Sequence, residues 1–145
     1  MTVIVRPATE PDLPGLLALY SELNPEDAPL PTESAHRIWT AIAAQPGRTV
    51  LVADRDGVLV GTADCIDLPN LTRGGRSILG VENVVVAEAH RRTGVGRQLM
   101  DAAMQLAKSA GCYKVQLLAA PEEEVHTFYR ACGLLPLAQG FRRYL

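Results

Sequence analysis

Apolar residues at helical spacing predict two helices in the first third of the chain. The first helix begins near Thr9, where a capping residue, a proline and an acid occur together, and it ends at about Leu23. The second helix is capped by Thr32 and stops near Gln45, before a Pro-Gly pair. The apolar faces consist of Leu13, Leu16, Leu17, Tyr20 and Leu23 in the first helix and Ile38, Trp39 and Ile42 in the second.

Runs rich in β-branched residues predict the strands. The Asp56–Gly57 pair joins two of these runs and indicates a hairpin, so those two strands are expected to be antiparallel. The predicted strands cover residues 2–6, 49–53, 58–66, 77–86 and 113–119. Two further helices are expected over residues 95–110 and 121–132, the second ended by Gly133. Residues 134–145 are expected to form a last strand or hairpin.

The order of these elements predicts a mixed α/β fold. Strand, helix and strand follow one another between residues 81 and 119, and such a crossover makes its two strands parallel. Hairpins connect the other strands, so the central sheet should be mixed, mostly antiparallel and flanked by about four helices. With 145 residues and no repeat or linker, residues 1–145 are expected to form a single domain.

Composition argues against several classes of protein. A net charge of -2 at pH 7 does not suit a general nucleic-acid surface. No apolar run approaches the roughly 20 residues of a membrane span, and the first residues lack the pattern of a signal peptide. We therefore expect a cytoplasmic protein with no nucleic-acid or membrane partner. Cys65, Cys112 and Cys132 are odd in number and widely spaced, which predicts reduced thiols and no metal site.

The stretch HRRTGVGRQLM, residues 90–100, carries the most specific chemical signal. It lies between the apolar run at residues 84–86 and an amphipathic helix, whose N-terminus offers unpaired backbone N–H groups and a positive dipole end. The glycines leave room for an oxyanion, and the arginines can add charge-assisted hydrogen bonds. The pattern indicates a phosphate-bearing ligand. The alternative is a tight turn with solvated arginines.

Two other phosphate-binding motifs do not fit this stretch. A dinucleotide fingerprint needs a third glycine three residues after Gly96, where Leu99 stands, and no acid follows at the ribose position. A Walker loop needs four residues between its glycines and then Lys-Ser/Thr, and neither feature is present.

Three segments together resemble the GCN5-related N-acetyltransferase (GNAT) superfamily. RRTGVG, residues 91–96, is similar to its acetyl-CoA signature, Q/R-x-x-G-x-G/A. RPATEPD, residues 6–12, and FYRACGL, residues 128–134, resemble two further motifs, with Leu134 in place of the commoner phenylalanine. The motifs follow the family's order over nearly the whole chain. The resemblance implies splayed central parallel strands and direct acetyl transfer from acetyl-CoA to a primary amine of a small molecule or peptide.

The resemblance also implies which residues hold the co-substrate. Backbone groups of Val84 and Val86 would meet the acetyl carbonyl and the pantetheine arm, where the central strands diverge. Phe128 would lie along the cofactor, or it belongs to the core. The pyrophosphate would bind at the signature and the residue after it, namely Arg91, Arg92, Thr93, Gly94, Val95, Gly96 and Arg97.

Two residues are expected to act in catalysis. An alkylamine is almost fully protonated at pH 7, so a base or a water chain leading to one is useful, and Glu82 near the signature is the candidate. Tyr129 matches the family's tyrosine near the coenzyme A sulfur, where it would donate a hydrogen bond or a proton to the leaving thiolate. A solvated carboxylate and an ordinary helix tyrosine are the structural alternatives.

The acceptor amine is not specified by the sequence. Residues 24–33, residues 68–76 and the C-terminal segment supply both acidic and basic side chains, so they fit a cationic amine or an acceptor with a carboxylate. A non-catalytic acyl-CoA-binding sensor is the alternative function, and nucleotide binding at the glycine loop is a third. The family resemblance also suggests a homodimer.

Overall fold

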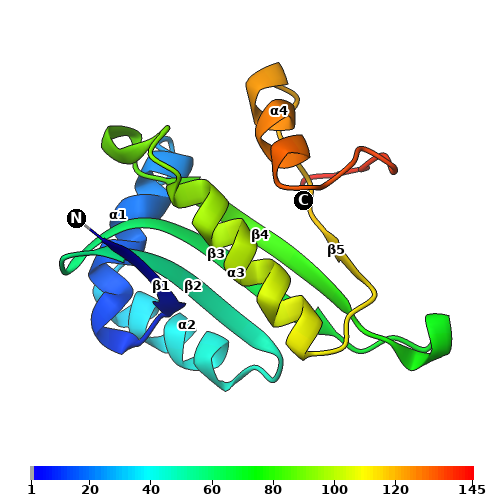
Figure 1. The fold of residues 1–145 in the computed structure, drawn as a ribbon. Helices are drawn as coiled ribbons and strands as arrows, with labels where there is room; N and C mark the ends of the chain where they lie inside the picture. Colours follow the sequence, from blue (N-terminus) through cyan, green and yellow to red (C-terminus); the bar gives the residue numbers. More distant parts are fainter. Residues whose placement is uncertain (1) are drawn as a thin grey trace.

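The computed structural model describes residues 2–145, which form one five-stranded sheet and four α-helices (Figure 1). In the sheet the strands lie in the order β1-β2-β3-β4-β5, with β4 and β5 parallel and all other neighbours antiparallel. The predicted mixed, mostly antiparallel sheet is confirmed. The strands are β1 (Val3–Pro7), β2 (Arg48–Arg55), β3 (Val58–Leu68), β4 (Ile78–Val86) and β5 (Lys114–Gln116).

Helices cover both faces of the sheet (Figure 1). α3 (Val95–Ser109) crosses one face, whereas α1 (Leu13–Leu23) and α2 (Thr32–Ala44) lie on the other. Alternate residues of β2 serve the two layers: Leu51 and Ala53 belong to the α3 core, and Val50 and Val52 pack with α1 and α2. The remaining elements are α4 (Glu123–Ala131) and the short 3-10 turns η1 (Glu10–Asp12), η2 (Arg73–Gly75) and η3 (Glu88–His90).

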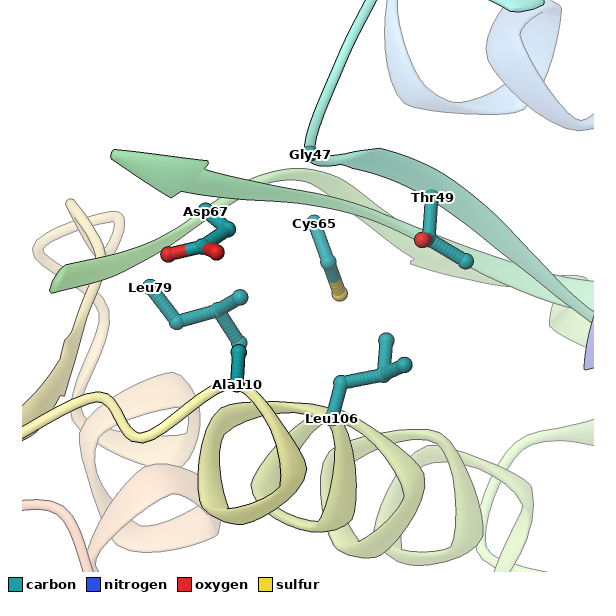
Figure 2. A pocket seen from close by; sticks show the side chains of 7 residues that line it. All are labelled: Gly47, Thr49, Cys65, Asp67, Leu79, Leu106 and Ala110. Atoms are coloured by element: carbon teal, nitrogen blue, oxygen red, sulfur yellow. The ribbon is translucent and has the colours of Figure 1, made fainter. Parts of the chain in front are cut away.

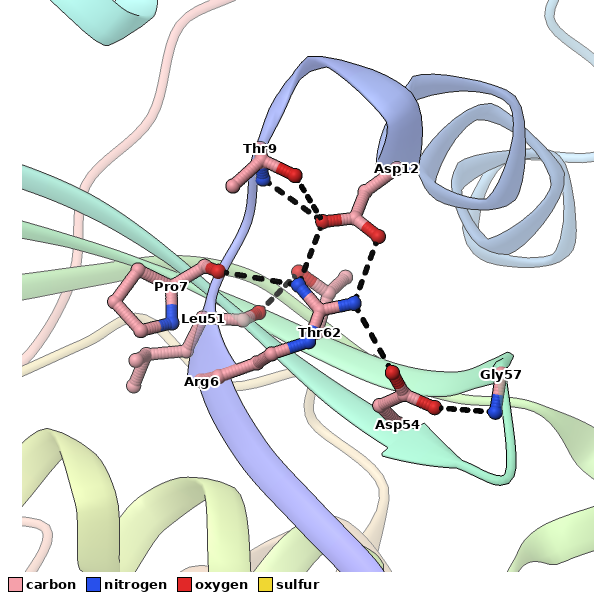
Figure 3. A network of polar contacts seen from close by, with 8 residues as sticks. All are labelled: Arg6, Pro7, Thr9, Asp12, Leu51, Asp54, Gly57 and Thr62. Carbon is pink, nitrogen blue, oxygen red and sulfur yellow. Dashed lines mark hydrogen bonds and ion pairs between the residues drawn. The ribbon is translucent and has the colours of Figure 1, made fainter.

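A network around Arg6 fixes the start of α1 against the sheet (Figure 3). The Arg6 guanidinium donates to both Asp12 carboxylate oxygens, at 2.7 and 2.9 Å, and to Asp54 Oδ2 at 3.0 Å. Asp12 also accepts from the Thr9 backbone N–H at 2.8 Å, which confirms the predicted capping motif. The Arg6 hydrogen bonds lower the pKa of Asp12 from 3.8 to about 2.

Four sequence predictions differ from the structure. α1 begins at Leu13 and not near Thr9, because Glu10–Asp12 form the 3-10 turn η1. Pro31, not Thr32, is the N-cap residue of α2, since Thr32 is already helical. β5 is shorter than predicted because it pairs with β4 only over Lys114–Gln116. The expected last strand in residues 134–145 is wrong: the structure describes no helix or strand there. A strand needs a neighbour for its backbone groups, and the chain has left the sheet after β5.

Candidate active site

A β-bulge interrupts the middle of β4. While β3 advances two residues, from Asp64 to Thr62, β4 advances three, from Glu82 to Val85. Asn83, within this step, has φ 51°, in the left-handed region that asparagine tolerates better than most residues. The bulge therefore resets the alternation of side chains along the strand.

The reset distributes the predicted site residues over two faces. Val84 and Val86 pack against the α3 core, whereas Glu82 is exposed and lies directly opposite Asp64, on the face of α1 and α2. Sequence alternation alone would have put Glu82 and Val84 on the same face. Because of the bulge, Val84 and Val86 face the α3 core, while the Glu82 carboxylate lies on the face of α1 and α2.

The second half of β4 has an open edge. β5 pairs only with Ile78–Gly80, and within residues 2–145 no strand pairs with residues 81–86 on that side. The backbone of Val84 and Val86 lies on this stretch. Unpaired N–H and C=O groups at a strand edge can pair with an extended ligand that carries amides.

The N-terminus of α3 starts just beyond the end of β4. Gly94 is the N-cap residue, with φ 87°, and Arg92 has φ 61°. No side chain caps this terminus, so the N–H groups of the first turn, from Val95 to Arg97, point out of the helix end without a capping partner. The local geometry fits the anion site that the sequence indicated.

Side chains of the loop and of the first turn of α3 divide into anchors, which bond to the backbone, and exposed cations. Arg91 Nε donates to the Val86 carbonyl at 3.1 Å, which ties the loop to the end of β4, and the Thr93 hydroxyl donates to the carbonyl of His90 within the loop. Arg92 and Arg97, with side chains 91% and 57% exposed, form solvent-exposed ion pairs with Glu124 at 3.9 Å and Asp101 at 3.7 Å, and such pairs are weak. Their guanidinium groups are available to a ligand.

Gly96 is required by the approach of α4. A Cβ atom on Gly96 would lie 3.0 Å from two ring atoms of Phe128 and 3.6 Å from Val86 Cγ2. These contacts bring the helix start, the end of β4 and the predicted cofactor-side aromatic together. Phe128 therefore packs on the first turn of α3, next to the helix terminus.

Tyr129 follows Phe128 on α4. Its ring lies edge-on to that of Phe128, with centroids 5.0 Å apart and an interplanar angle of 64°. Burial, followed by the neighbouring Cys132 thiol, raises the pKa of the Tyr129 hydroxyl. The tyrosine is consequently protonated at neutral pH and can donate a hydrogen bond. In residues 2–145 no hydrogen bond connects Tyr129 to Glu82.

The polar side chains around Asp64, the residue paired with Glu82, are the part of the site that the sequence did not predict. Arg48 forms a salt bridge with the buried Asp64, and Tyr20 of α1 lies close to Asp64 and Thr62. The sequence indicated only Tyr20 among these residues, as part of the apolar face of the first helix. An acid within the apolar run of β3 was the one available signal, and its partner is sixteen residues away in sequence.

A separate cavity of about 150 Å³ lies near the other end of α3 (Figure 2). It is lined by Cys65, Asp67, Leu79 and Leu106, among others. Burial raises the pKa of the Cys65 thiol to about 12, so it is protonated and a poor nucleophile. The cysteines are unbridged, as predicted. This cavity is distant along the helix from Gly94 and adds no reactive group to the site.

Residues 2–145 contain neither a metal-binding cluster nor a membrane-spanning helix. No group of three or more His, Cys, Asp or Glu side chains in residues 2–145 is arranged to hold a metal ion. Over the same residues, no helix has the length and apolarity to cross a bilayer.

Comparison with known proteins identifies the family. The family model described as Acetyltransferase (GNAT) family matches residues 14–134. The chain belongs to this family. A provisionally assigned acetyltransferase structure from Agrobacterium tumefaciens strain C58 is 43% identical, with a TM-score of 0.95 over 98% of this chain and 99% of that one. The predicted family, fold class and enzyme class are therefore confirmed.

Two GNAT relatives that match this chain are named for the same acceptor. Glucosamine 6-phosphate N-acetyltransferase 1 from rice is 31% identical over 137 residues, 90% of this chain and 80% of the relative. Glucosamine 6-phosphate N-acetyltransferase from Trypanosoma brucei brucei is 38% identical over 77 residues, and that match spans about half of each protein, 53% and 51%. An aminoglycoside N-acetyltransferase solved in complex with CoA shares the fold, with a TM-score of 0.83 and 20% identity.

Proposed function

We propose that this GNAT protein transfers an acetyl group from acetyl-CoA to the primary amine of a small molecule. The observation that carries the proposal is the uncapped N-terminus of α3 beside the open edge of β4. The N–H groups of residues 92–97, with Arg92 and Arg97, would bind the pyrophosphate. The pantetheine arm would then run along Val84 and Val86, which brings the thioester toward the bulge.

Glu82 is assigned the role of base, and Tyr129 that of hydrogen-bond donor to the leaving sulfur. Glu82 is exposed at the bulge and would take the proton of the acceptor ammonium, directly or through water. As the amine attacks the acetyl carbonyl, the C–S bond breaks, the sulfur leaves as a thiolate, and the nitrogen loses its second proton to water, which leaves a neutral amide. Tyr129, whose pKa is raised by burial, would stabilise that sulfur by donating a hydrogen bond.

For the acceptor we propose a phosphorylated amino sugar. The curated relatives are named for glucosamine 6-phosphate, and the rice protein matches 90% of this chain. A sugar phosphate also needs a cationic group at some distance from the amine. Arg73 and Arg76 on the β3–β4 loop and Arg142 and Arg143 in the C-terminal segment are exposed cations that could supply it.

A thiol-release assay tests the proposal. Acetyl-CoA would be offered with glucosamine 6-phosphate, glucosamine, a kanamycin-type aminoglycoside and a lysine peptide, with calorimetry of acetyl-CoA and ATP binding in parallel. We expect tighter binding of acetyl-CoA than of ATP and the fastest thiol release with glucosamine 6-phosphate. Binding without release for any amine would instead support the non-catalytic sensor, and preference for ATP would refute the site.

We also propose a homodimer in the cytoplasm. In residues 134–145 five large apolar side chains are exposed: Leu135, Leu137, Phe141, Tyr144 and Leu145. Such a set on one segment is unfavourable in water and fits coverage by a second copy. The three free cysteines fit a reducing compartment.

A further inference from the structure

A side-chain hydrogen bond connects the loop before α3 to the far end of β2. Arg55 Nη1, on the last residue of β2, lies 2.9 Å from Nδ1 of His90. Because an arginine can only donate, His90 Nδ1 accepts this hydrogen bond and the ring carries its proton on Nε2. Both residues are half-buried. The contact therefore ties the β4–α3 loop, residues 87–94, to the sheet.

Arg55 lies on the face of the sheet that α3 covers. Leu51 and Ala53, which precede it at alternate positions of β2, belong to the α3 core. Ala53 pairs with Gly61 of β3, and a Cβ atom on Gly61 would lie 3.0 Å from Val95 in the first turn of α3. Two residues further along this face, Arg55 is therefore beside the start of the helix.

The stability of the fold does not account for an arginine at this position. Within residues 2–145 the Arg55 Nε atom is buried without a hydrogen-bond partner, and no ion pair includes this residue. A desolvated N–H without an acceptor and a half-buried charge without a counter-charge both disfavour the folded state. The bond to His90 is the favourable polar contact that the guanidinium makes in the described chain.

The backbone of His90 belongs to a strained turn directly before the N-cap of α3. The Thr93 hydroxyl donates to the His90 carbonyl at 2.5 Å, and the His90 N–H donates to the Ala87 carbonyl at 2.8 Å. Inside this turn Arg92 has φ 61°. A residue with a Cβ atom keeps such a left-handed backbone only where the surrounding contacts fix it. The side chain of His90, held by Arg55, is one of these contacts.

We propose that Arg55 and His90 are positioning residues for the pyrophosphate of acetyl-CoA. Their hydrogen bond holds the β4–α3 loop in the conformation that leaves the N–H groups at the start of α3 open to the ligand. The inference rests on the proposed pyrophosphate site, and neither side chain needs to touch the co-substrate. When the bond is lost, fewer molecules have the binding conformation, so the apparent affinity falls while the rate at saturation is retained.

Calorimetric titration with acetyl-CoA tests this inference. In His90→Leu and in Arg55→Met we expect the Kd to rise about tenfold, the effect of losing one hydrogen bond from a charged donor. The double variant should bind no more weakly than the weaker single variant, because both changes remove the same contact. In His90→Asn the Kd should return to within about twofold of wild type, since Asn Oδ1 is as many bonds from Cα as His Nδ1 and accepts a hydrogen bond.

The division between kcat and KM separates positioning from a general loss of structure. With the fastest amine of the thiol-release panel, both single variants should show a raised KM for acetyl-CoA and a kcat within about twofold of wild type. A merely structural role would lower kcat as well. His36→Leu, a change at an exposed histidine of α2, is the matched control and should bind acetyl-CoA as wild type does.

Gly94→Asp in the same titrations distinguishes the two ways of failing. If Gly94→Asp binds acetyl-CoA like wild type, the pyrophosphate site itself is refuted. If Gly94→Asp loses affinity while folded His90→Leu and Arg55→Met do not, the positioning role alone is overturned. Losses that add in the double variant, a His90→Asn protein as weak as His90→Leu, or a matching fall in kcat would overturn it too. Should Arg55→Met fail to fold, His90→Leu and His90→Asn still give the comparison.

Discussion

Gly94 meets two separate requirements at the start of α3. Its φ of 87° is unfavourable for any residue with a Cβ atom, and its position as N-cap keeps side-chain atoms away from the first turn. Gly96 differs, since it has an ordinary helical backbone and makes room for Phe128. Gly94 thus permits the left-handed backbone and leaves room for the ligand, whereas Gly96 permits α4 to pack against α3.

For Gly94→Asp we expect the Kd for acetyl-CoA to rise about tenfold or more, because a carboxylate at the N-cap would repel the pyrophosphate and occupy the free N–H groups. Isothermal titration calorimetry measures this. Gly57→Asp is the matched control, since Gly57 in the β2–β3 hairpin has φ 89° and equally open surroundings. An equal loss of affinity in both variants would point to general strain and count against the phosphate site.

For Glu82→Gln we expect kcat to fall about 100-fold while the Kd for acetyl-CoA stays the same, since removal of a general base affects proton transfer and not cofactor binding. Steady-state thiol release and calorimetry provide the two values. Glu88→Gln, a change at another exposed acid six residues along the chain, should retain activity. Wild-type kinetics in Glu82→Gln would remove the residue from the mechanism.

At the scale of elements, the fold depends on how α1 is held to the sheet. Arg6 on β1 links Asp12, at the first turn before α1, with Asp54 on β2, and Asp54 in turn accepts from the Gly57 N–H at 2.7 Å. One guanidinium therefore ties a helix start, a strand and a hairpin turn together (Figure 3). Asp12 is only 11% exposed, so solvent screens this pair less than a surface ion pair.

Asp12→Asn should lower the free energy of unfolding by about 2 kcal/mol at pH 7, which corresponds to the fall in the Asp12 pKa from 3.8 to about 2. Because folding depresses this pKa, its contribution is complete above pH 4 and is lost as the pH falls towards 2. Urea denaturation at pH 7 and at pH 3 checks both statements. The variant should lack this part of the acid sensitivity, and Asp27→Asn, in an exposed loop, should behave as wild type.

Most elements were predictable because their signals are local. The β2–β3 hairpin follows from the Asp-Gly turn, and Gly133, with φ 89°, ends α4 as expected. The bulge at Asn83 was not predictable, since it depends on how β3 and β4 align. The Arg48–Asp64 pair was missed for the same reason: it joins two strands through a side-chain contact that no sequence spacing reveals.

At the scale of the whole molecule, the segment after α4 is less buried than the rest. The central layers share two buried cores, but the segment after α4 exposes Leu137 at 85% and Phe141 at 90%. No apolar layer within residues 2–145 covers these side chains. The predicted last strand or hairpin is wrong because the chain has left the sheet after β5 and these residues have no neighbouring strand with which to pair.

We expect light scattering to give the mass of a dimer for the wild-type chain and a shift towards monomer for Leu137→Asp, because a charge would be buried in the contact. Leu71→Asp is the control: Leu71 is also fully exposed but lies in the β3–β4 loop. A monomeric wild type over the micromolar range would contradict the proposed homodimer.

The open edge of β4 has a consequence for handling the protein. Exposed strand edges recruit other extended chains, and residues 81–86 offer such an edge beside a three-residue β5 that is too short to shield it. Acetyl-CoA bound along residues 81–86 would cover this edge and so reduce aggregation. It would also raise the melting temperature by mass action, in proportion to the logarithm of its concentration above its Kd.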